Sequence, residues 1–382
     1  MQKKHLGRML CSFALSALTL WGVSVTTAAK DARAALRSLR EESLGVMLLR
    51  YERGDGGEEY LSMQTSLALR AAPLLRGEDE RIAQAWSTEL TQKPDDGAAG
   101  DAQDNEGTVL TQEKTPDEVA VTENGVPART LKASDPSGYT VFGNVYINNG
   151  SDAALDASML GTDYAACLGA DEPQVLIIHT HGTESYTMPP GQEYDVSDTF
   201  RTLDTNCNMI RVGDEMARTL TECGISVVHD RALYDYPSYS GAYNRSLASI
   251  ERYLEKYPSI SFVLDVHRDA VQDANGNQFK LLCGEDAGAA QLEFVIGSNG
   301  GGLSHDLWRE NLKLACAVQE TLYKDYPTLM RPVTVRNSRY NQHMTTGSLL
   351  VEVGTAGNSL EEAVNAARIF AAGFAKTLQN GD

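Results

Sequence analysis

Three apolar runs in this sequence each lead into side chains that can bind a metal ion or transfer a proton. VLIIHTHGTESY ends in His179, His181 and Glu184. SISFVLDVHRDA carries His267 after its apolar part, and SLLVEVGTAGNSLEEA places Glu352 at the close of a further run. Such runs are typical of buried strands, and ligands bind at the carboxyl ends of the strands in an open α/β sheet. Two or three imidazoles and two carboxylates at that edge are what a mononuclear zinc hydrolase requires.

Each of these residues has a role in such a site. Zinc hydrolysis needs three protein ligands, an open position for water, and a base. His181 and His267 are the natural imidazole ligands, and Glu184 is the carboxylate nearest to His181 in sequence. Strand alternation places His179 on the same side as His181, so one could bind the metal while the other orients it or contacts substrate. An acid that closes a buried strand is costly unless paired, near a metal or raised in pKa, which suits Glu352 to the role of general base.

Several of these residues also have simpler explanations. Glu184 could be a loop carboxylate that caps a backbone turn. His343, in the loop RYNQHMT, gains interest only because Glu352 follows nine residues later. Tyr236 and Tyr239, in YDYPSY, could line a groove or simply pack. Other chemistries fit less well, because no serine lies in a nucleophile-elbow pattern and GSNGGG lacks the Lys and Ser/Thr of a phosphate-binding loop.

Strand-like and helix-like segments alternate from about residue 139 to the end of the chain. Strands are predicted at 141–150, 175–178, 225–230, 260–266, 294–297 and 348–354, and helices at 210–224, 245–258, 308–327 and 359–378. Strands that alternate with helices of this length predict an α/β fold, with a mostly parallel sheet and helices on both faces. Residues 139–382 are therefore expected to form a single domain.

The first 138 residues differ in composition from the rest. Residues 1–29 contain a basic stub followed by 21 uncharged residues, which can form a membrane anchor or a cleaved signal peptide. In either case the basic flank stays inside and the rest of the chain is exported. Residues 30–90 show helical spacing of apolar residues, which predicts a helical juxtamembrane region. Residues 91–138 are rich in Asp, Glu, Gly and Pro, which predicts an acidic disordered linker.

Charge and cysteine content limit the classes of partner. The formal net charge of −19 argues against nucleic acid or an anionic lipid surface as the main partner, because both would repel the chain. Six cysteines, one of them in the leader, show no CxxC pair. A disulfide framework or a cysteine zinc site is therefore not expected, and buried free thiols are the better prediction.

At these residues the sequence resembles the stage II sporulation protein P family of endospore-forming bacteria. The resemblance runs from about Tyr139 to the carboxyl terminus and is carried by HTHGTESY, NMIRVGDEMARTL, GISVVHD, YDYPSYSGAYNRS, DVHRDA, RYNQH and LLVEVGTAGNSLEEA. It implies a three-layer domain like that of zinc-dependent N-acetylmuramoyl-L-alanine amidases. It also implies that the chain thins septal peptidoglycan during engulfment, cuts peptide crosslinks as well, and works with sporulation membrane and wall-hydrolase proteins.

The amidases that this family resembles have zinc ligands and a catalytic glutamate in recognisable settings. Their first ligand is a histidine that ends the first strand, which here falls on His181 or, as the second choice, His179. The second histidine falls on His267. The catalytic glutamate, in an L-V-E-x-G setting, falls on Glu352.

One position departs from the pattern of those amidases. They take a glutamate ligand at the start of the following helix, where this chain offers Asn206 in DTNCNMIRV. We therefore expect Glu184 to be the third ligand. Arg268 and His343 are candidates for stabilising the tetrahedral oxyanion or gripping a stem-peptide carboxylate.

The leading hypothesis is a zinc amidase that acts on peptidoglycan. Its catalytic domain lies outside the cell membrane and is held by a single N-terminal anchor, or is secreted if the leader is cleaved. Two other classes stay open at this point: a non-catalytic wall-binding or scaffold protein, and a general exported metallopeptidase. A functional Glu352→Gln variant would favour the scaffold, and activity on casein but not on sacculi would favour the peptidase.

Overall fold

The domain is built on an eight-stranded sheet whose strands form where short apolar runs are bounded by turn residues. The computed structural model describes residues 126–169, 171–188, 200–272 and 278–380, with the backbone of two short strands before them. The strands of the large sheet lie in the order β4, β5, β12, β11, β13, β8, β6, β7. Their bounds are Thr140–Phe142 (β4), Val145–Asn149 (β5), Val175–Ile178 (β6), Val227–His229 (β7), Phe262–Asp269 (β8), Leu292–Gly297 (β11), Val333–Arg336 (β12) and Gly347–Thr355 (β13).

Most neighbouring strands of this sheet run parallel. Five of the seven neighbouring pairs are parallel, and only β4–β5 and β11–β13 are antiparallel. Parallel neighbours need long crossover connections, which the intervening helices supply. The predicted α/β class with a mostly parallel sheet is confirmed. The strand β12, which the sequence did not reveal, lies between β5 and β11.

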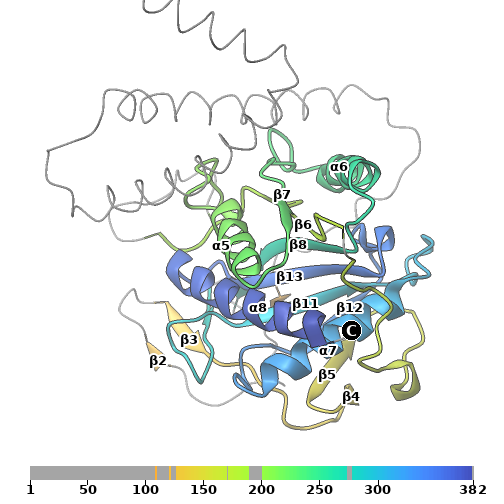
Figure 1. Cartoon of the computed structure of the whole chain (residues 1–382). Coiled ribbons are helices and arrows are strands. Elements are labelled where there is room, and N and C mark those ends of the chain that lie inside the picture. The colour runs from red at the N-terminus through yellow and green to blue at the C-terminus, as the bar shows by residue number, and fades with distance from the viewer. Residues whose placement is uncertain are drawn as a thin grey trace, which may run out of the picture. The chain divides into compact units, whose positions relative to one another are not determined.

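Four long helices accompany these strands in the described part of the chain (Figure 1). They are α5 (Met209–Glu222), α6 (Ala242–Lys256), α7 (Trp308–Tyr323) and α8 (Leu360–Asn380). Helix α5 begins where it does because the Asn208 side chain accepts a hydrogen bond of 3.0 Å from the backbone N–H of Ile210. Helix α8 begins with Glu361 and Glu362, whose charges suit the positive end of a helix. Helix α8 packs against both α5 and α7.

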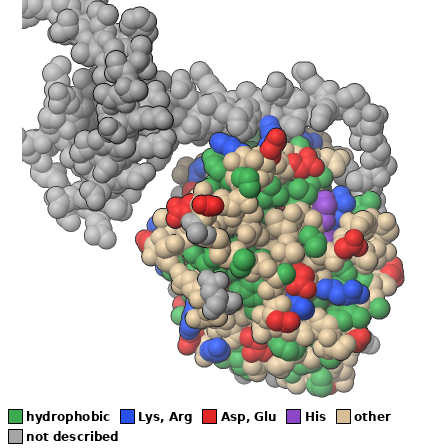
Figure 2. All heavy atoms as spheres, turned by 45° about the vertical axis from the view of Figure 1, so that its right-hand side comes forward, with side chains coloured by type: hydrophobic (Ala, Val, Ile, Leu, Met, Phe, Trp, Pro, Cys, Tyr) green, Lys and Arg blue, Asp and Glu red, His purple; other side chains and the backbone are tan. Residues whose placement is uncertain are grey.

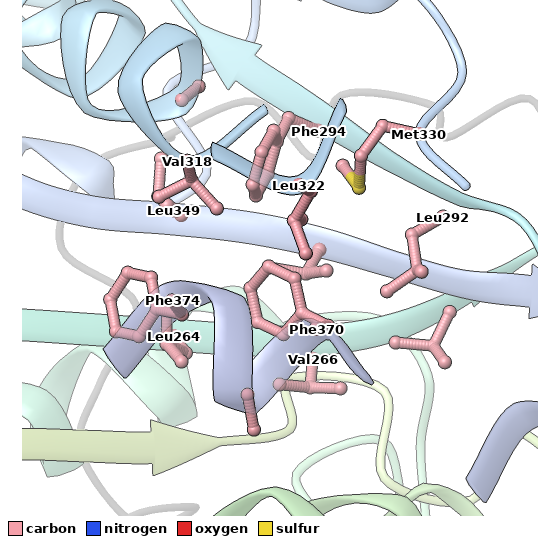
Figure 3. Close-up of a cluster of buried hydrophobic side chains, with 14 of the residues drawn as sticks. Leu264, Val266, Leu292, Phe294, Val318, Leu322, Met330, Leu349, Phe370 and Phe374 are labelled. Carbon is pink, nitrogen blue, oxygen red and sulfur yellow. The ribbon is translucent and has the colours of Figure 1, made fainter. Parts of the chain in front are cut away.

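The two faces of the sheet bury different apolar side chains, because successive residues of a strand point to opposite faces. Leu264 of β8 faces the larger core, which includes Phe370 and Phe374 of α8 (Figure 3). The two phenylalanines stack with ring centroids 5.8 Å apart, and burying each one contributes about 1.5–3 kcal/mol. Val263, the preceding residue of β8, faces a smaller cluster with Ile250 of α6. Helices therefore cover both faces, with α5, α7 and α8 on one and α6 on the other.

A small second sheet extends the fold beyond the predicted boundary at residue 139. Strand β3 (Pro127–Arg129) pairs with β10 (Lys280–Leu281) and with β2 (Ala120–Val121). The side chain of Gln291 holds both backbone groups of Leu131: its Oε1 accepts from the N–H at 2.7 Å, and its Nε2 donates to the carbonyl at 3.0 Å. The end of the segment predicted as a linker is thus folded. Its few apolar residues bury little surface, but hydrogen bonds to its backbone hold it in place.

Other parts of the predicted organisation fall outside the described residues. The expected leader at 1–29 and helical region at 30–90 lie there, as does most of the linker at 91–138. Strand β1 (Thr108–Val109) of that linker pairs with β9 (Val271–Gln272). Within the described ranges, the structure contains no helix with the length and apolar character needed to cross a membrane.

The five cysteines of the described chain are all free thiols. Cys283 and Cys316 are buried, as predicted, and burial raises the pKa of Cys316 to about 12. Cys167 is exposed, and Cys207 and Cys223 are half-buried. The prediction of buried thiols is wrong for these three, because Cys167 and Cys207 lie in loops and Cys223, at the end of helix α5, packs only partly against the core.

Candidate metal centre

The carboxyl ends of β6 and β8 bring His181, Glu184 and His267 into one buried cluster. Nδ1 of His181 lies 3.7 Å from Oε1 of Glu184, and Nδ1 of His267 lies 3.7 Å from Oε2 of the same carboxylate. One possible ligand atom from each residue lies within 4.8 Å of the other two. The two imidazole rings meet edge to face with centroids 5.0 Å apart. The arrangement leaves nitrogen and oxygen atoms facing a common point, as a small metal site requires.

Strand geometry explains why His267 and Glu352 reach the same face. On β8, Asp265 and His267 alternate with Leu264 and Val266, which belong to the large core. Their side chains therefore point away from that core, toward the side covered by α6. Strand β13 runs parallel to β8 with Glu352 directly opposite His267. The sheet thus places the predicted general base beside a predicted ligand.

Glu352 has an unusual environment for a carboxylate. Its Oε2 is buried and has no hydrogen-bond partner in the described chain. Burial raises the pKa of Glu352 well above its ordinary value of 4.5 against the opposing effect of His267, and the charges of Asp269, Glu184 and Glu293 raise it further. A buried, unsatisfied polar atom costs free energy, so its position beside the cluster calls for an explanation.

The two clustered histidines have opposite pKa shifts. Burial lowers the pKa of His181 well below its ordinary 6.5, and the charges of His267 and Arg201 act in the same direction. Burial would also lower the pKa of His267, but Asp265, Glu184 and Glu352 together raise it to about 10. The acidic groups around His267 therefore favour a positive charge in this part of the cluster.

Arg201 contacts the carboxylate of Glu184, and Asp235 in turn contacts Arg201. The guanidinium of Arg201 lies 3.5 Å from Oε1 of Glu184 and 2.9 Å from Oδ2 of Asp235. Asp235 is buried and also accepts hydrogen bonds from the backbone N–H and the hydroxyl of Thr183. The ring of Tyr239 stacks on His181 at 4.5 Å, and the Arg201 guanidinium lies 5.0 Å from the centroid of that ring. These contacts fix the loop that carries His181 and Glu184.

With this geometry in place, the comparison with known families gives a clear result. The sequence matches the family described as Stage II sporulation protein P (SpoIIP) over residues 60–375, which is well over half of the chain. This chain belongs to that family. It is 28% identical over 219 residues to Stage II sporulation protein P of Bacillus subtilis (strain 168), a match that covers 54% of this chain. The chain spans about half the length of this curated relative, because the match covers 51% of it. The resemblance seen in the sequence is confirmed.

Solved structures with similar folds include several amidases. N-acetylmuramoyl-L-alanine amidase AmiC2 of Nostoc punctiforme is 16% identical, with 56% of this chain and 96% of that chain covered and a TM-score of 0.31. The CwlD amidase from Clostridioides difficile, solved in complex with the GerS lipoprotein, is 14% identical, with 55% and 98% covered and a TM-score of 0.34.

Strand alternation predicted that His179 would lie on the same side as His181. In this SpoIIP chain the two side chains lie on different sides. Its Nδ1 lies 2.9 Å from the carbonyl oxygen of Val266, and its Nε2 lies 2.8 Å from Nε2 of His229. The ring faces α5, where a Cβ added at Gly213 would come within 2.4 Å of Nε2. The prediction fails because β6 ends at Ile178, so the two-residue alternation no longer applies beyond it.

Arg268, one of the two candidates for contacting substrate, has other partners. Arg268 donates to the carbonyls of Ser185 at 2.9 Å and Phe200 at 3.2 Å, and its backbone N–H donates to Oε2 of Glu184 at 3.3 Å. It therefore supports the ligand loop. His343 lies in the short 3-10 helix η4 (Gln342–Met344), and its ring centroid is 6.4 Å from that of His305. Burial and then the charge of Arg339 lower the pKa of His343 to about 4.

The position at which this chain departs from the amidase pattern does not belong to the cluster. Asn206 is exposed and bonds to Asp204 in the turn before α5. Glu184, in contrast, lies 3.7 Å from Nδ1 of both His181 and His267. Sequence reasoning missed Arg201 and Asp235 because each is an isolated charged residue in a polar loop, and no spacing signal links them. Only the fold brings them to Glu184.

Proposed function

We propose that this domain is a zinc-dependent hydrolase that cleaves the amide between N-acetylmuramic acid and L-alanine in peptidoglycan. The observation that carries the proposal is the buried cluster of His181, Glu184 and His267 beside the unpartnered Oε2 of Glu352. Membership of the SpoIIP family and the amidase-like motifs support peptidoglycan as the substrate.

The donor set fits zinc. Two imidazole nitrogens and one carboxylate oxygen are the ligands of known catalytic zinc sites, which keep a further position open for water. His267 presents Nδ1 to the cluster, while its Nε2 lies 2.9 Å from Oδ1 of Asp265. A metal-binding histidine usually has a carboxylate or carbonyl partner on its other nitrogen. His181, Glu184 and His267 would hold the ion.

The chemistry divides between the ion and the chain. Zinc in such a site acts as a Lewis acid on a carbonyl oxygen and makes water a stronger nucleophile. Glu352 accepts the proton of the attacking water and then passes it to the leaving amine. Burial raises the pKa of Glu352, whereas a bound cation would favour its ionised form. The carboxyl group can therefore accept a proton and release it again within one cycle. The loop held by Arg201 and Arg268 keeps Glu184 in place throughout.

The wider role is part of the same proposal. We propose that the enzyme works at the outer side of the cell membrane during sporulation engulfment, held by its amino-terminal segment. It also cuts peptide crosslinks and acts with sporulation membrane and wall-hydrolase proteins. Family membership supports the sporulation role. The presence of Glu184 beside both histidines favours a catalytic site over a degenerate wall-binding one.

Digestion of purified sacculi tests the proposal. The full chain is incubated with sacculi, with and without a zinc chelator, and the soluble products are identified by mass spectrometry. We expect free stem peptides only without chelator, and shortened crosslinked peptides in addition if the second activity is present. A zinc-loaded, folded protein that releases nothing, alone or with candidate partner proteins, would contradict the hydrolase role.

A further inference from the structure

Asp265 occupies the position behind His267 that faces away from the candidate metal. It is buried, and its Oδ1 lies 2.9 Å from Nε2 of His267 in a close ion-pair contact. That nitrogen is buried and has no aligned hydrogen-bond partner among the described residues. The carboxylate of Asp265 is the polar group beside it. Nδ1, the other nitrogen of the same ring, faces Glu184. A neutral imidazole carries its proton on one nitrogen only, so a proton held on Nε2 leaves the lone pair of Nδ1 for a metal ion.

Thr180 holds Asp265 in place with two hydrogen bonds. Its backbone N–H donates to Oδ1 at 2.8 Å, and its hydroxyl donates to Oδ2 at 2.6 Å. Thr180 directly precedes His181, the other imidazole of the cluster. One buried carboxylate on β8 thus contacts the ring of one predicted ligand and fixes the backbone next to the other.

Further contacts, from Ser246 on helix α6 and from Asn341, hold Thr180. Its Oγ1 lies 2.8 Å from Oγ of Ser246 on α6, and the side chain of Asn341 donates to that same Oγ at 3.1 Å. Asn341 also donates to the carbonyl of Tyr243 at 2.8 Å, and its backbone is left-handed with φ of 56°. Asparagine adopts this conformation more readily than most residues. The segment RYNQH therefore reaches the cluster through Asn341 rather than through its histidine.

We propose that Asp265 and Thr180 are positioning residues that hold His267 in the tautomer and orientation needed to bind a metal ion through Nδ1. The inference rests on the proposed zinc site and adds to it a buried chain of contacts from Asn341 through Ser246 and Thr180 to Asp265. The carboxylate keeps the proton on Nε2 and leaves Nδ1 open to the ion. Its negative charge also favours a cation in the cluster.

The variant Asp265→Asn tests this with almost no change in size. The carboxylate faces three donors: the N–H of Thr180, the hydroxyl of Thr180 and Nε2 of His267. Asparagine has no charge and only one acceptor oxygen, so its NH2 group faces either the Thr180 hydroxyl, which can accept, or the N–H of Thr180 and Nε2 of His267. If it faces His267, the ring shifts its proton to Nδ1 and cannot bind metal there. We expect zinc affinity to fall by about 10- to 100-fold, the usual effect of losing such a partner.

A matched control and a graded pair make the test specific. Asp230, at the end of the neighbouring strand β7, is also buried and accepts from the N–H of Ala232 and the hydroxyl of Tyr234. Asp230→Asn should keep zinc affinity within about threefold, because its partners lie outside the cluster. Thr180→Val removes the hydroxyl and should weaken zinc by about 3- to 10-fold, whereas Thr180→Ser should restore wild-type affinity.

The measurement is zinc affinity of the full-length variants, by competition with a chromophoric chelator, beside the visible spectrum of the cobalt-substituted proteins. A changed cobalt spectrum in Asp265→Asn, together with the Thr180→Ser rescue, supports positioning of the ligand. Equal zinc affinity in wild type and Asp265→Asn overturns the inference while the proposed zinc site stands. A wild-type chain that binds no zinc overturns both. Should Asp265→Asn fail to fold, the two Thr180 variants decide, and equal affinity in that pair overturns the inference.

Discussion

The pair His179–His229 and the pair His181–His267 lie at the carboxyl ends of neighbouring strands of one sheet. Both pairs are held in the domain interior, and both have an acidic neighbour. In the first pair, His179 uses one ring nitrogen on a backbone carbonyl and the other on His229, and Nδ1 of His229 lies 3.2 Å from Asp214. Every ring nitrogen of that pair therefore has a partner within the chain.

The second pair faces a shared carboxylate instead. Nδ1 of His181 and Nδ1 of His267 each lie 3.7 Å from Glu184, which is longer than a hydrogen bond. One possible ligand atom from each of His181, Glu184 and His267 lies within 4.8 Å of the other two, which is close enough for one ion to contact all three. The difference shows that burial and sequence spacing alone do not separate a structural histidine from a metal ligand. The groups that each ring faces do separate them: a backbone carbonyl and another imidazole for His179, and a shared carboxylate for His181 and His267.

Removing one of the proposed ligands should have the largest effect on zinc affinity. If it had none, the proposed difference between the two histidine pairs would be wrong. We expect His267→Ala to lower zinc affinity by more than about 100-fold, since even the loss of an outer partner costs about 10- to 100-fold. The matched variant His229→Ala should stay within about threefold of wild type, because that ring contacts no member of the cluster. Chelator competition on the purified full-length proteins measures both. Equal losses in the two variants would mean that the pairs do not differ in function.

Glu352→Gln separates metal binding from proton transfer. The amide keeps the size of the side chain but cannot accept the proton of water, so we expect hydrolysis of sacculi to fall by about 10²- to 10⁴-fold. Zinc content, measured by metal analysis, should stay at the wild-type level because Glu352 is not one of the three ligands. An active Glu352→Gln protein would remove this residue from its proposed role.

Gly213→Ala probes the structural pair without touching a histidine. Alanine normally favours a helix interior over glycine by about 1 kcal/mol. Here the new Cβ would lie 2.4 Å from Nε2 of His179 and 2.5 Å from Nε2 of His229, and overpacking of this kind costs about 1–3 kcal/mol. We expect the steric cost to prevail and to lower the free energy of unfolding in urea, with zinc affinity kept. A stabilised variant would show that the pair can move aside.

The smallest expected effect concerns pH and the ion pairs that Glu215 of α5 makes with Arg218 and Arg368. Burial would raise the pKa of Glu215, but hydrogen bonds from Arg218 and Arg368 and their charges lower it to about 2. A lowered pKa stabilises the fold above the unfolded value of about 4.5, and this stabilisation is lost as the pH falls toward 2. Because both arginines are half exposed, we expect about 1 kcal/mol. The difference in unfolding free energy between Glu215→Gln and wild type, measured in urea, should be present at pH 7 and shrink as the pH falls toward 2. A constant difference would contradict the shift.

Much of the candidate site could be predicted from the sequence because apolar runs fix where buried strands end. Strands β6, β8 and β13 appear as predicted, and they deliver His181, His267 and Glu352 to one edge. Glu184 followed from its distance along the chain alone. The side that His179 faces could not be predicted, because alternation stops where the strand stops.

Other features depend on contacts between distant segments. Strand β12 is four residues long and polar at two of them, so its pattern does not stand out. Strand β3 lies in acidic, proline-containing sequence and is defined by its pairing with β10. Arg201 joins Glu184 only because the loop before α5 returns to the ligand loop, where Glu184 and Arg201 form a β-bridge. Such long-range placements leave no periodic signal in the sequence.

The central claim is that the cluster of His181, Glu184 and His267 binds the catalytic metal, and anomalous diffraction at the zinc edge tests it most directly. The account predicts one strong peak in crystals of the zinc-loaded protein, at about 2.0–2.2 Å from Nδ1 of each histidine and an oxygen of Glu184. A peak between His179, His229 and Asp214, or no peak in a folded protein at saturating zinc, would contradict it.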